Sequence, residues 1–347
     1  MRRLLVLLAT ATARKNKTSK LDNKNKTSKL VLFWHFHKAG GTSFCRMLKE
    51  AKLREGGYNC GCNFRRTVEG RRGVSENPLR IGAQRSAFAI AEDMARRGAD
   101  VCMVERGSEF PTADELRGFS ADWRGLGGAL VAVFRDPWQR FTSTFLRDYG
   151  EFFLHAFSEK EFRNNGYGAA DVAAQKRTAT IEDFASPTFN ATPMGHHARV
   201  WGSINRPNFY VRHLVGVDDG DVVMTMRDLK AALATLAYFT HVFLLDGDIQ
   251  RGVQHNLTGR DDVHIRKPQS NNPYSGANAA KRNKRLPAPP DVAHYNATFA
   301  RENCLDAALV AEVRRRVARA GTCAGCAPAP PSSAPKDVCG PRRAWVQ

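Results

Sequence analysis

Residues 37–43, His-Lys-Ala-Gly-Gly-Thr-Ser, combine a lysine, two adjacent glycines and two hydroxyl side chains. Glycine lets the backbone turn tightly and bring several N–H groups to one point, where they attract an anion together with a lysine. The Walker pattern GxxxxGK[ST] has its lysine after the second glycine, whereas Lys38 precedes Gly40 and Gly41. Taken alone, the stretch fits two readings: a phosphate- or sulfate-binding turn that differs from the usual nucleotide P-loop, or a glycine-bearing strand–helix turn of an ordinary α/β protein.

A second group of charged and hydroxyl side chains follows residues 129–134. Arg135 comes directly after this apolar run, and Asp136 predicts the N-cap of a helix that has Pro137 at its first position. One reading is a second anion site; the other is a well-capped amphipathic helix with solvated arginines. The polar residues expected to share one face of this helix are Arg140, Ser143 and Arg147.

Both groups follow segments that are predicted to be strands. Residues 30–36 and 129–134 are continuous apolar runs, as in strands buried on both faces. A helix is expected after each run, with Thr42 or Ser43 as the N-cap of the first. Because the carboxyl ends of parallel strands meet at one sheet edge, the two sites are expected on that edge. The pattern predicts an α/β fold with a central, mostly parallel sheet flanked by helices.

The strings KxGGTS and RDPxxRxxSxF resemble the 5′-phosphosulfate and 3′-phosphate motifs of sulfotransferases that use 3′-phosphoadenosine 5′-phosphosulfate (PAPS). The closest resemblance is to Golgi carbohydrate sulfotransferases of the 2-O-sulfotransferase kind. It implies a P-loop-like three-layer fold and transfer of a sulfuryl group from PAPS to a carbohydrate hydroxyl, with no metal. Two alternatives stay open: a P-loop-type kinase, and a non-catalytic basic glycan-binding protein on the same scaffold.

The resemblance also implies roles for individual residues. Lys38 would neutralise the bridging and leaving oxygens, and Arg135 with Ser143 would hold the 3′-phosphate. The segment DVHIRKP resembles a basic segment that closes over the nucleotide, although a solvated loop is the competing interpretation. The cofactor-binding residues implied in this way are Lys38, Ala39, Gly40, Gly41, Thr42, Ser43, Arg135, Ser143, Arg266 and Lys267.

The general base is less well defined by the sequence. Glu105 follows a predicted strand, Val101–Val104, where the family has its catalytic Glu or His. The 2-O-type enzymes have a histidine in this region, but the chain has none between His37 and His155. Glu105 is the preferred candidate; the remaining candidates are His37, which adjoins Lys38, and Glu109.

Two segments farther along the chain bear on the rest of the site. Residues 168–207 are polar and are expected to form an irregular insertion on the acceptor side. Residues 208–216, NFYVRHLVG, resemble a recurring N-x-Y-x-R-x-L-x-G segment of the same enzymes.

The chain of 347 residues carries a net charge of +19, from 53 Lys and Arg against 34 Asp and Glu. This excess predicts a polyanionic partner. The sequence has no RNA-binding aromatic pattern, zinc-finger spacing or helix-turn-helix pattern, so no nucleic-acid partner is expected. An acidic or neutral glycan is the acceptor that the resemblance implies.

The chain divides into four predicted parts. Residues 1–14 resemble a signal peptide or short signal-anchor, 15–29 form a basic repeat stem, 30–320 the sulfotransferase domain, and 321–347 a Cys/Pro-rich tail. Eight cysteines and five Asn-x-Ser/Thr sequons fit the Golgi lumen, for a membrane-anchored or secreted protein. Disulfides are favoured over a zinc site. The cysteines considered for that zinc site are Cys60, Cys62, Cys323 and Cys326.

Overall fold

The computed structural model describes residues 30–36, 39–54, 86–106, 112–154, 166–198, 205–217, 222–245, 249–253, 257, 290–320 and 339. Its centre is a sheet in which all described pairings are parallel and the strand order is β2-β1-β3-β4. The strands are β1 (Val31–Phe36), β2 (Val101–Arg106), β3 (Ala129–Phe134) and β4 (His241–Leu244).

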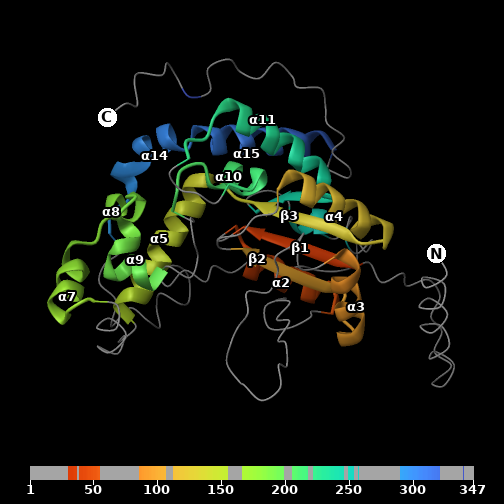
Figure 1. The fold of residues 1–347 in the computed structure, drawn as a ribbon, viewed down its shortest axis with the longest axis horizontal. Helices are drawn as coiled ribbons and strands as arrows, with labels where there is room; N and C mark the ends of the chain where they lie inside the picture. Colours follow the sequence, from red (N-terminus) through yellow and green to blue (C-terminus); the bar gives the residue numbers. More distant parts are fainter. Residues whose placement is uncertain are drawn as a thin grey trace.

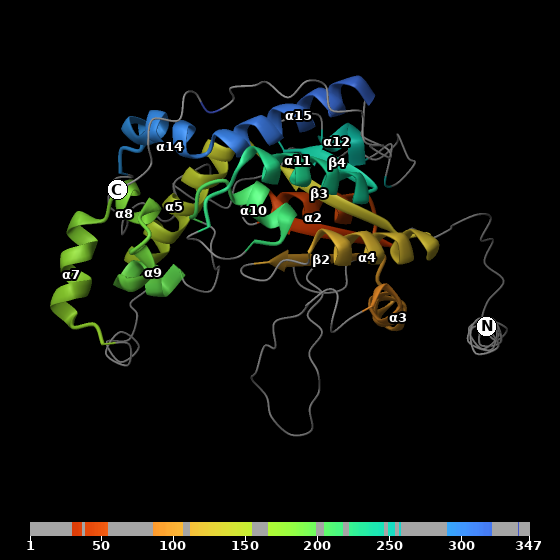
Figure 2. The same ribbon diagram turned by 45° about the horizontal axis from the view of Figure 1, so that its top comes forward.

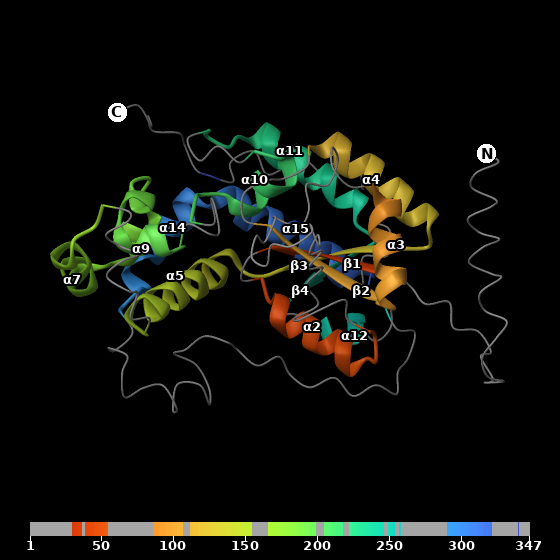
Figure 3. The ribbon, with the colours of Figure 1, turned by 60° about the horizontal axis from the view of Figure 1, so that its bottom comes forward.

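Helices cover both faces of the sheet, as Figure 3 shows. Residues that alternate along β1 enter two separate apolar clusters, because successive side chains of a strand point to opposite faces. One face packs against α2 (Gly41–Glu50) and α12 (Ile249–Gly252). The helices on the other face are α3 (Ala87–Arg97), α4 (Ala113–Gly125), α10 (Phe209–Val215), α11 (Met226–Thr235) and α15 (Cys304–Ala320). The predicted α/β architecture with a parallel sheet between two helical layers is confirmed.

Local sequence patterns account for several element ends. Ser86 accepts a hydrogen bond from the Ala89 N–H at the start of α3, and Gly98 ends this helix in the left-handed conformation at φ 63°. Thr112 and Glu115 form a capping box at the start of α4.

Figure 2 shows α15 lying along α10 and α11 on the outside of the sheet.

A third apolar cluster lies beyond the sheet, where α5 (Pro137–Leu154) carries Phe141 and Phe145 away from β3 (Figure 1). The expectation of an irregular segment over residues 168–207 is wrong, because short helices pack against this part of α5. These helices bury Ile181, Phe184 and Met194. The helices that carry these three residues are too short for a helical period to be recognised in the sequence. The elements around α5 are α7 (Ala169–Thr178), α8 (Ile181–Ala185), η3 (Phe189–Ala191), α9 (Pro193–Ala198), η7 (Ala293–Tyr295) and α14 (Asn296–Glu302).

Among the described residues, no helix combines the length and the apolar character needed to cross a membrane. Residues 1–29, which include the predicted targeting segment and stem, lie outside the described part of the chain. Of the predicted tail, only Cys339 is described.

Candidate anion-binding site at the carboxyl edge of the sheet

The two predicted anion-binding motifs leave neighbouring strands. β1 pairs with β3 in a parallel register that runs from Val31 opposite Ala129 to Trp34 opposite Ala132. The last residues of the two strands, Phe36 and Phe134, have ring centroids 4.9 Å apart. The connections after β1 lead first to β2 and then back across to β3, so this edge is also the topological switch point of the sheet. Ligands of open α/β sheets bind at such points.

The turn after β1 requires glycine at position 40. Gly40 adopts φ +93° and ψ 23°, and its carbonyl accepts the first helical hydrogen bond, from the Phe44 N–H at 2.8 Å. A Cβ atom on Gly40 would lie 2.5 Å from Leu245 Cδ1. Gly40 is therefore the N-cap of α2, and the expectation that Thr42 or Ser43 would cap the helix is wrong. The left-handed backbone lets the helix begin before the hydroxyl residues.

Gly41 lies directly against His35, a buried residue of β1. The Gly41 N–H donates to His35 Nε2 at 3.0 Å, and a Cβ atom on Gly41 would lie 2.3 Å from that same nitrogen. His35 Nε2 is therefore the acceptor of this hydrogen bond. The Ala39 N–H donates to the Phe36 carbonyl at 3.0 Å. The amides of Ala39 and Gly41, two of the residues implied to bind the cofactor, thus donate to protein acceptors.

Several predicted site residues lie outside what the structure describes. His37, Lys38 and Glu109 are among them, as are Arg266 and Lys267. The side chains of Thr42 and Glu105 are also outside the described set. The backbone of Glu105 pairs with His35 in the β1–β2 register, at the carboxyl end of β2.

Arg135 is held at the end of β3 by Tyr210. Its N–H donates to the Tyr210 hydroxyl at 3.1 Å, and that hydroxyl donates to the Arg135 carbonyl at 3.0 Å. The Arg135 side chain is half-buried, and its Nε donates to Gln139 Oε1 at 3.4 Å. Asp136 caps α5 as predicted, because its Oδ1 accepts the Gln139 N–H at 3.0 Å.

The polar face of α5 is not uniform. Ser143 and Arg147 are half-buried, but Arg140 is only 1% exposed and its guanidinium carbon lies 3.9 Å from the centroid of the Phe209 ring. Burial lowers the pKa of Arg140. The interpretation of solvated arginines is therefore wrong for Arg140. The sequence of α5 alone could not reveal this, because the ring that covers Arg140 belongs to α10.

The N-x-Y-x-R-x-L-x-G segment forms α10 and its two ends. Asn208 and Gly216 flank the helix in the left-handed conformation, at φ 56° and φ 75°. Arg212 is buried, and its Nε donates to the Pro207 carbonyl at 2.8 Å. Leu214 enters the core on the α10 face of the sheet. These recurring positions thus build α10 behind Arg135.

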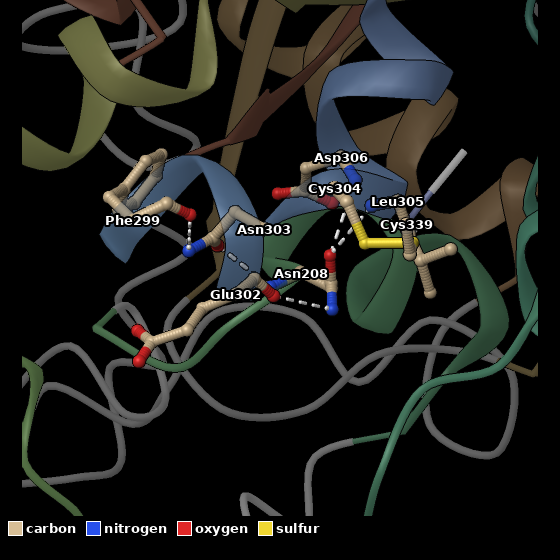
Figure 4. Close-up of a disulfide and its surroundings, with 8 residues drawn as sticks. All are labelled: Asn208, Phe299, Glu302, Asn303, Cys304, Leu305, Asp306 and Cys339. Atoms are coloured by element: carbon tan, nitrogen blue, oxygen red, sulfur yellow. Dashed lines mark hydrogen bonds between the residues drawn. A yellow bond between two sulfur atoms is a disulfide. The ribbon is translucent and has the colours of Figure 1, made fainter. Parts of the chain in front are cut away.

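The starts of α10 and α15 are joined by side chains, as Figure 4 shows. Asp306 accepts the N–H groups of Tyr210 and Val211, each at 3.0 Å, while Asn208 Oδ1 accepts the Leu305 N–H at 3.1 Å. Burial raises the pKa of Asp306 to about 6, against the opposing effect of these two hydrogen bonds. A disulfide from Cys304 to Cys339 lies at the same point.

A scan against models of protein families finds no match to the chain, and searches of curated proteins and of solved structures find none either. Within the ranges that the structure describes, no three His, Cys, Asp or Glu side chains gather as metal ligands would.

Proposed function

We propose that the chain is a PAPS-dependent sulfotransferase with a P-loop-like fold that acts on a carbohydrate hydroxyl. One observation carries this proposal: the KxGGTS turn and the RDP helix start leave adjacent parallel strands at one sheet edge, where Phe36 and Phe134 are in ring contact. A nucleotide with phosphates at both its 5′ and 3′ positions needs two anion sites close together. The topological switch point supplies that place.

The turn after β1 suits the 5′-phosphosulfate end. Gly40 and Gly41 have no room for a Cβ atom, so only residues without a side chain fit this part of the turn. The intrahelical hydrogen bonds of α2 begin with Phe44, so the amides of Thr42 and Ser43 precede them. These amides, the positive end of the α2 dipole and Lys38 would hold the 5′-phosphate.

Sulfuryl transfer moves a charged group in line between two oxygens, so catalysis depends on positioning and on charge stabilisation. Lys38 would stabilise charge on the leaving phosphate oxygen. Glu105, or His37 or Glu109 in its stead, would take the proton of the acceptor hydroxyl. Arg135 and Ser143 would bind the 3′-phosphate, with Arg266 and Lys267 closing over the nucleotide.

The net charge of +19 suits a doubly anionic donor and an acidic glycan. The Cys304–Cys339 disulfide and a further disulfide at Cys102 suit an oxidising compartment, in line with a Golgi location.

A transfer assay tests the proposal. Purified protein is incubated with radiolabelled PAPS and a panel of uronic-acid-containing and neutral glycans. Wild type should label at least one glycan, and Lys38→Ala should lower transfer about 10²–10³-fold, as loss of one charge-stabilising donor does in other enzymes. Lys49→Ala, which removes an exposed lysine of α2, is the matched control and should keep full activity.

Equal activity in both lysine variants would remove Lys38 from the mechanism. Failure of the wild type to label any glycan while it consumes ATP would favour a kinase. Failure to transfer any group, with binding of glycans retained, would favour a non-catalytic glycan-binding protein.

A further inference from the structure

The Tyr210 hydroxyl makes two hydrogen bonds to one residue, Arg135. It accepts the Arg135 N–H at 3.1 Å and donates to the Arg135 carbonyl at 3.0 Å. A phenol can do both at once, because it has one donor and free lone pairs. The two bonds hold the peptide groups on either side of the Arg135 Cα, and so fix the direction in which its side chain leaves the strand.

The position of Tyr210 is itself fixed by the two strands that carry the anion-binding motifs. Its ring centroid lies 5.2 Å from that of Phe36 and 5.1 Å from that of Phe134, the last residues of β1 and β3. The side chain is fully buried. Burial raises the pKa of Tyr210, so the hydroxyl keeps its proton and remains a donor.

The backbone of Tyr210 is held from the opposite side by α15. Asp306 Oδ2 accepts the Tyr210 N–H at 3.0 Å, and Asp306 Oδ1 accepts the Val211 N–H at 3.0 Å. A chain of direct contacts therefore runs from Asp306 through Tyr210 to Arg135. Of these three residues, only Arg135 has a role that the sequence motifs predict.

We propose that Tyr210 is a positioning residue that presents Arg135 to the 3′-phosphate of the nucleotide and thereby sets the preference for 3′-phosphorylated donors. This inference rests on the proposed function. Gln139 adds a contact to the side chain itself, because its side-chain oxygen accepts from Arg135 Nε at 3.4 Å. A planar guanidinium can bind a phosphate through paired N–H donors, so the direction in which Arg135 leaves the strand matters for that geometry.

The test compares two ligands that differ in the 3′-phosphate alone: 3′-phosphoadenosine 5′-phosphate and adenosine 5′-phosphate. Calorimetric titration of wild type and Tyr210→Phe should give about tenfold weaker binding of the bisphosphate by the variant, since two hydrogen bonds are lost. Binding of adenosine 5′-phosphate should change less than about twofold. Tyr295→Phe is the matched control, since it removes a partly buried hydroxyl that donates to Glu302 Oε2 at 2.8 Å, and both affinities should remain unchanged.

A merely structural role for Tyr210 would weaken both ligands equally or neither, and either result overturns the inference. Hydrogen exchange in the wild type gives a second test that needs no variant. The bisphosphate should slow exchange of the Arg135 amide more than adenosine 5′-phosphate does, and equal slowing contradicts the proposal. If wild type binds neither nucleotide, the proposed function itself fails; if it binds the bisphosphate but Tyr210→Phe binds equally well, only the inference fails.

Discussion

Asn208 and Asp306 cap each other's helices. Asn208 precedes α10 and accepts the Leu305 N–H at the start of α15, whereas Asp306 lies in α15 and accepts two N–H groups at the start of α10. A side chain at the start of each helix thus accepts hydrogen bonds from the backbone N–H groups at the start of the other helix. This pairing lies directly behind Tyr210 and Arg135, so the candidate nucleotide site depends on a junction between distant parts of the chain.

The buried Asp306 predicts an unusual dependence of stability on pH. Its folded pKa of about 6 lies above the unfolded value of 3.8, so the folded state holds a proton more tightly than the unfolded chain. The stability that the folded state gains from this proton is present at low pH and is lost as the pH rises to about 6. The unfolding free energy of wild type minus that of Asp306→Asn should therefore fall by about 2 kcal/mol between pH 4.5 and 7.5. Denaturant titrations at several pH values measure it, and a difference that rises with pH would refute this account.

The Cys304–Cys339 disulfide should stabilise the junction measurably. It closes a loop with a sequence separation of 35 and ties the first residue of α15 to the tail. Cys339→Ser should lower the unfolding free energy by about 2–4 kcal/mol, since the unfolded chain loses a constraint. Cys339 is exposed, so the substitution removes little packing. Thermal unfolding of the two proteins under non-reducing conditions is the measurement, and identical melting temperatures would exclude a stabilising role.

Gly41 should not tolerate a methyl group. A Cβ atom there would lie 2.3 Å from His35 Nε2, so Gly41→Ala must displace a buried ring or the turn itself. We expect a loss of about 1–3 kcal/mol in stability, as for other overpacked sites, together with weaker binding of the bisphosphate nucleotide. Gly118→Ala in α4, where a Cβ atom meets nothing within 4 Å, is the control and should stabilise by about 0.5–1 kcal/mol. Equal behaviour of the two variants would show that His35 does not confine this turn.

The candidate base predicts a separation of turnover from binding. Glu105→Gln keeps the size of the side chain but removes its basicity, so turnover should fall about 10²-fold or more. Binding of 3′-phosphoadenosine 5′-phosphate should remain within about twofold of wild type. Steady-state kinetics and calorimetry measure the two quantities. Unchanged turnover would direct the search to His37 or Glu109.

The sequence predicts what is local in this fold. Apolar runs give β1 and β3, and Asp136 caps α5 as expected. What depends on distant contacts is missed. Arg140 is buried because α10 supplies the Phe209 ring, and Asp306 caps α10 from another helix; neither is visible in a local pattern. Helix α2 starts earlier than the sequence predicted, because Gly40 in the left-handed conformation takes the N-cap position in place of a hydroxyl side chain.

The most direct test of the account is calorimetric titration with 3′-phosphoadenosine 5′-phosphate and, separately, with ATP and magnesium. Wild type, Arg135→Ala and Arg117→Ala are compared; Arg117 is an exposed residue of α4, so its loss changes the net charge equally. The account predicts that wild type and Arg117→Ala bind the bisphosphate well and ATP poorly, and that Arg135→Ala loses the bisphosphate. Binding of ATP alone, or of neither nucleotide, would contradict a PAPS-dependent sulfotransferase.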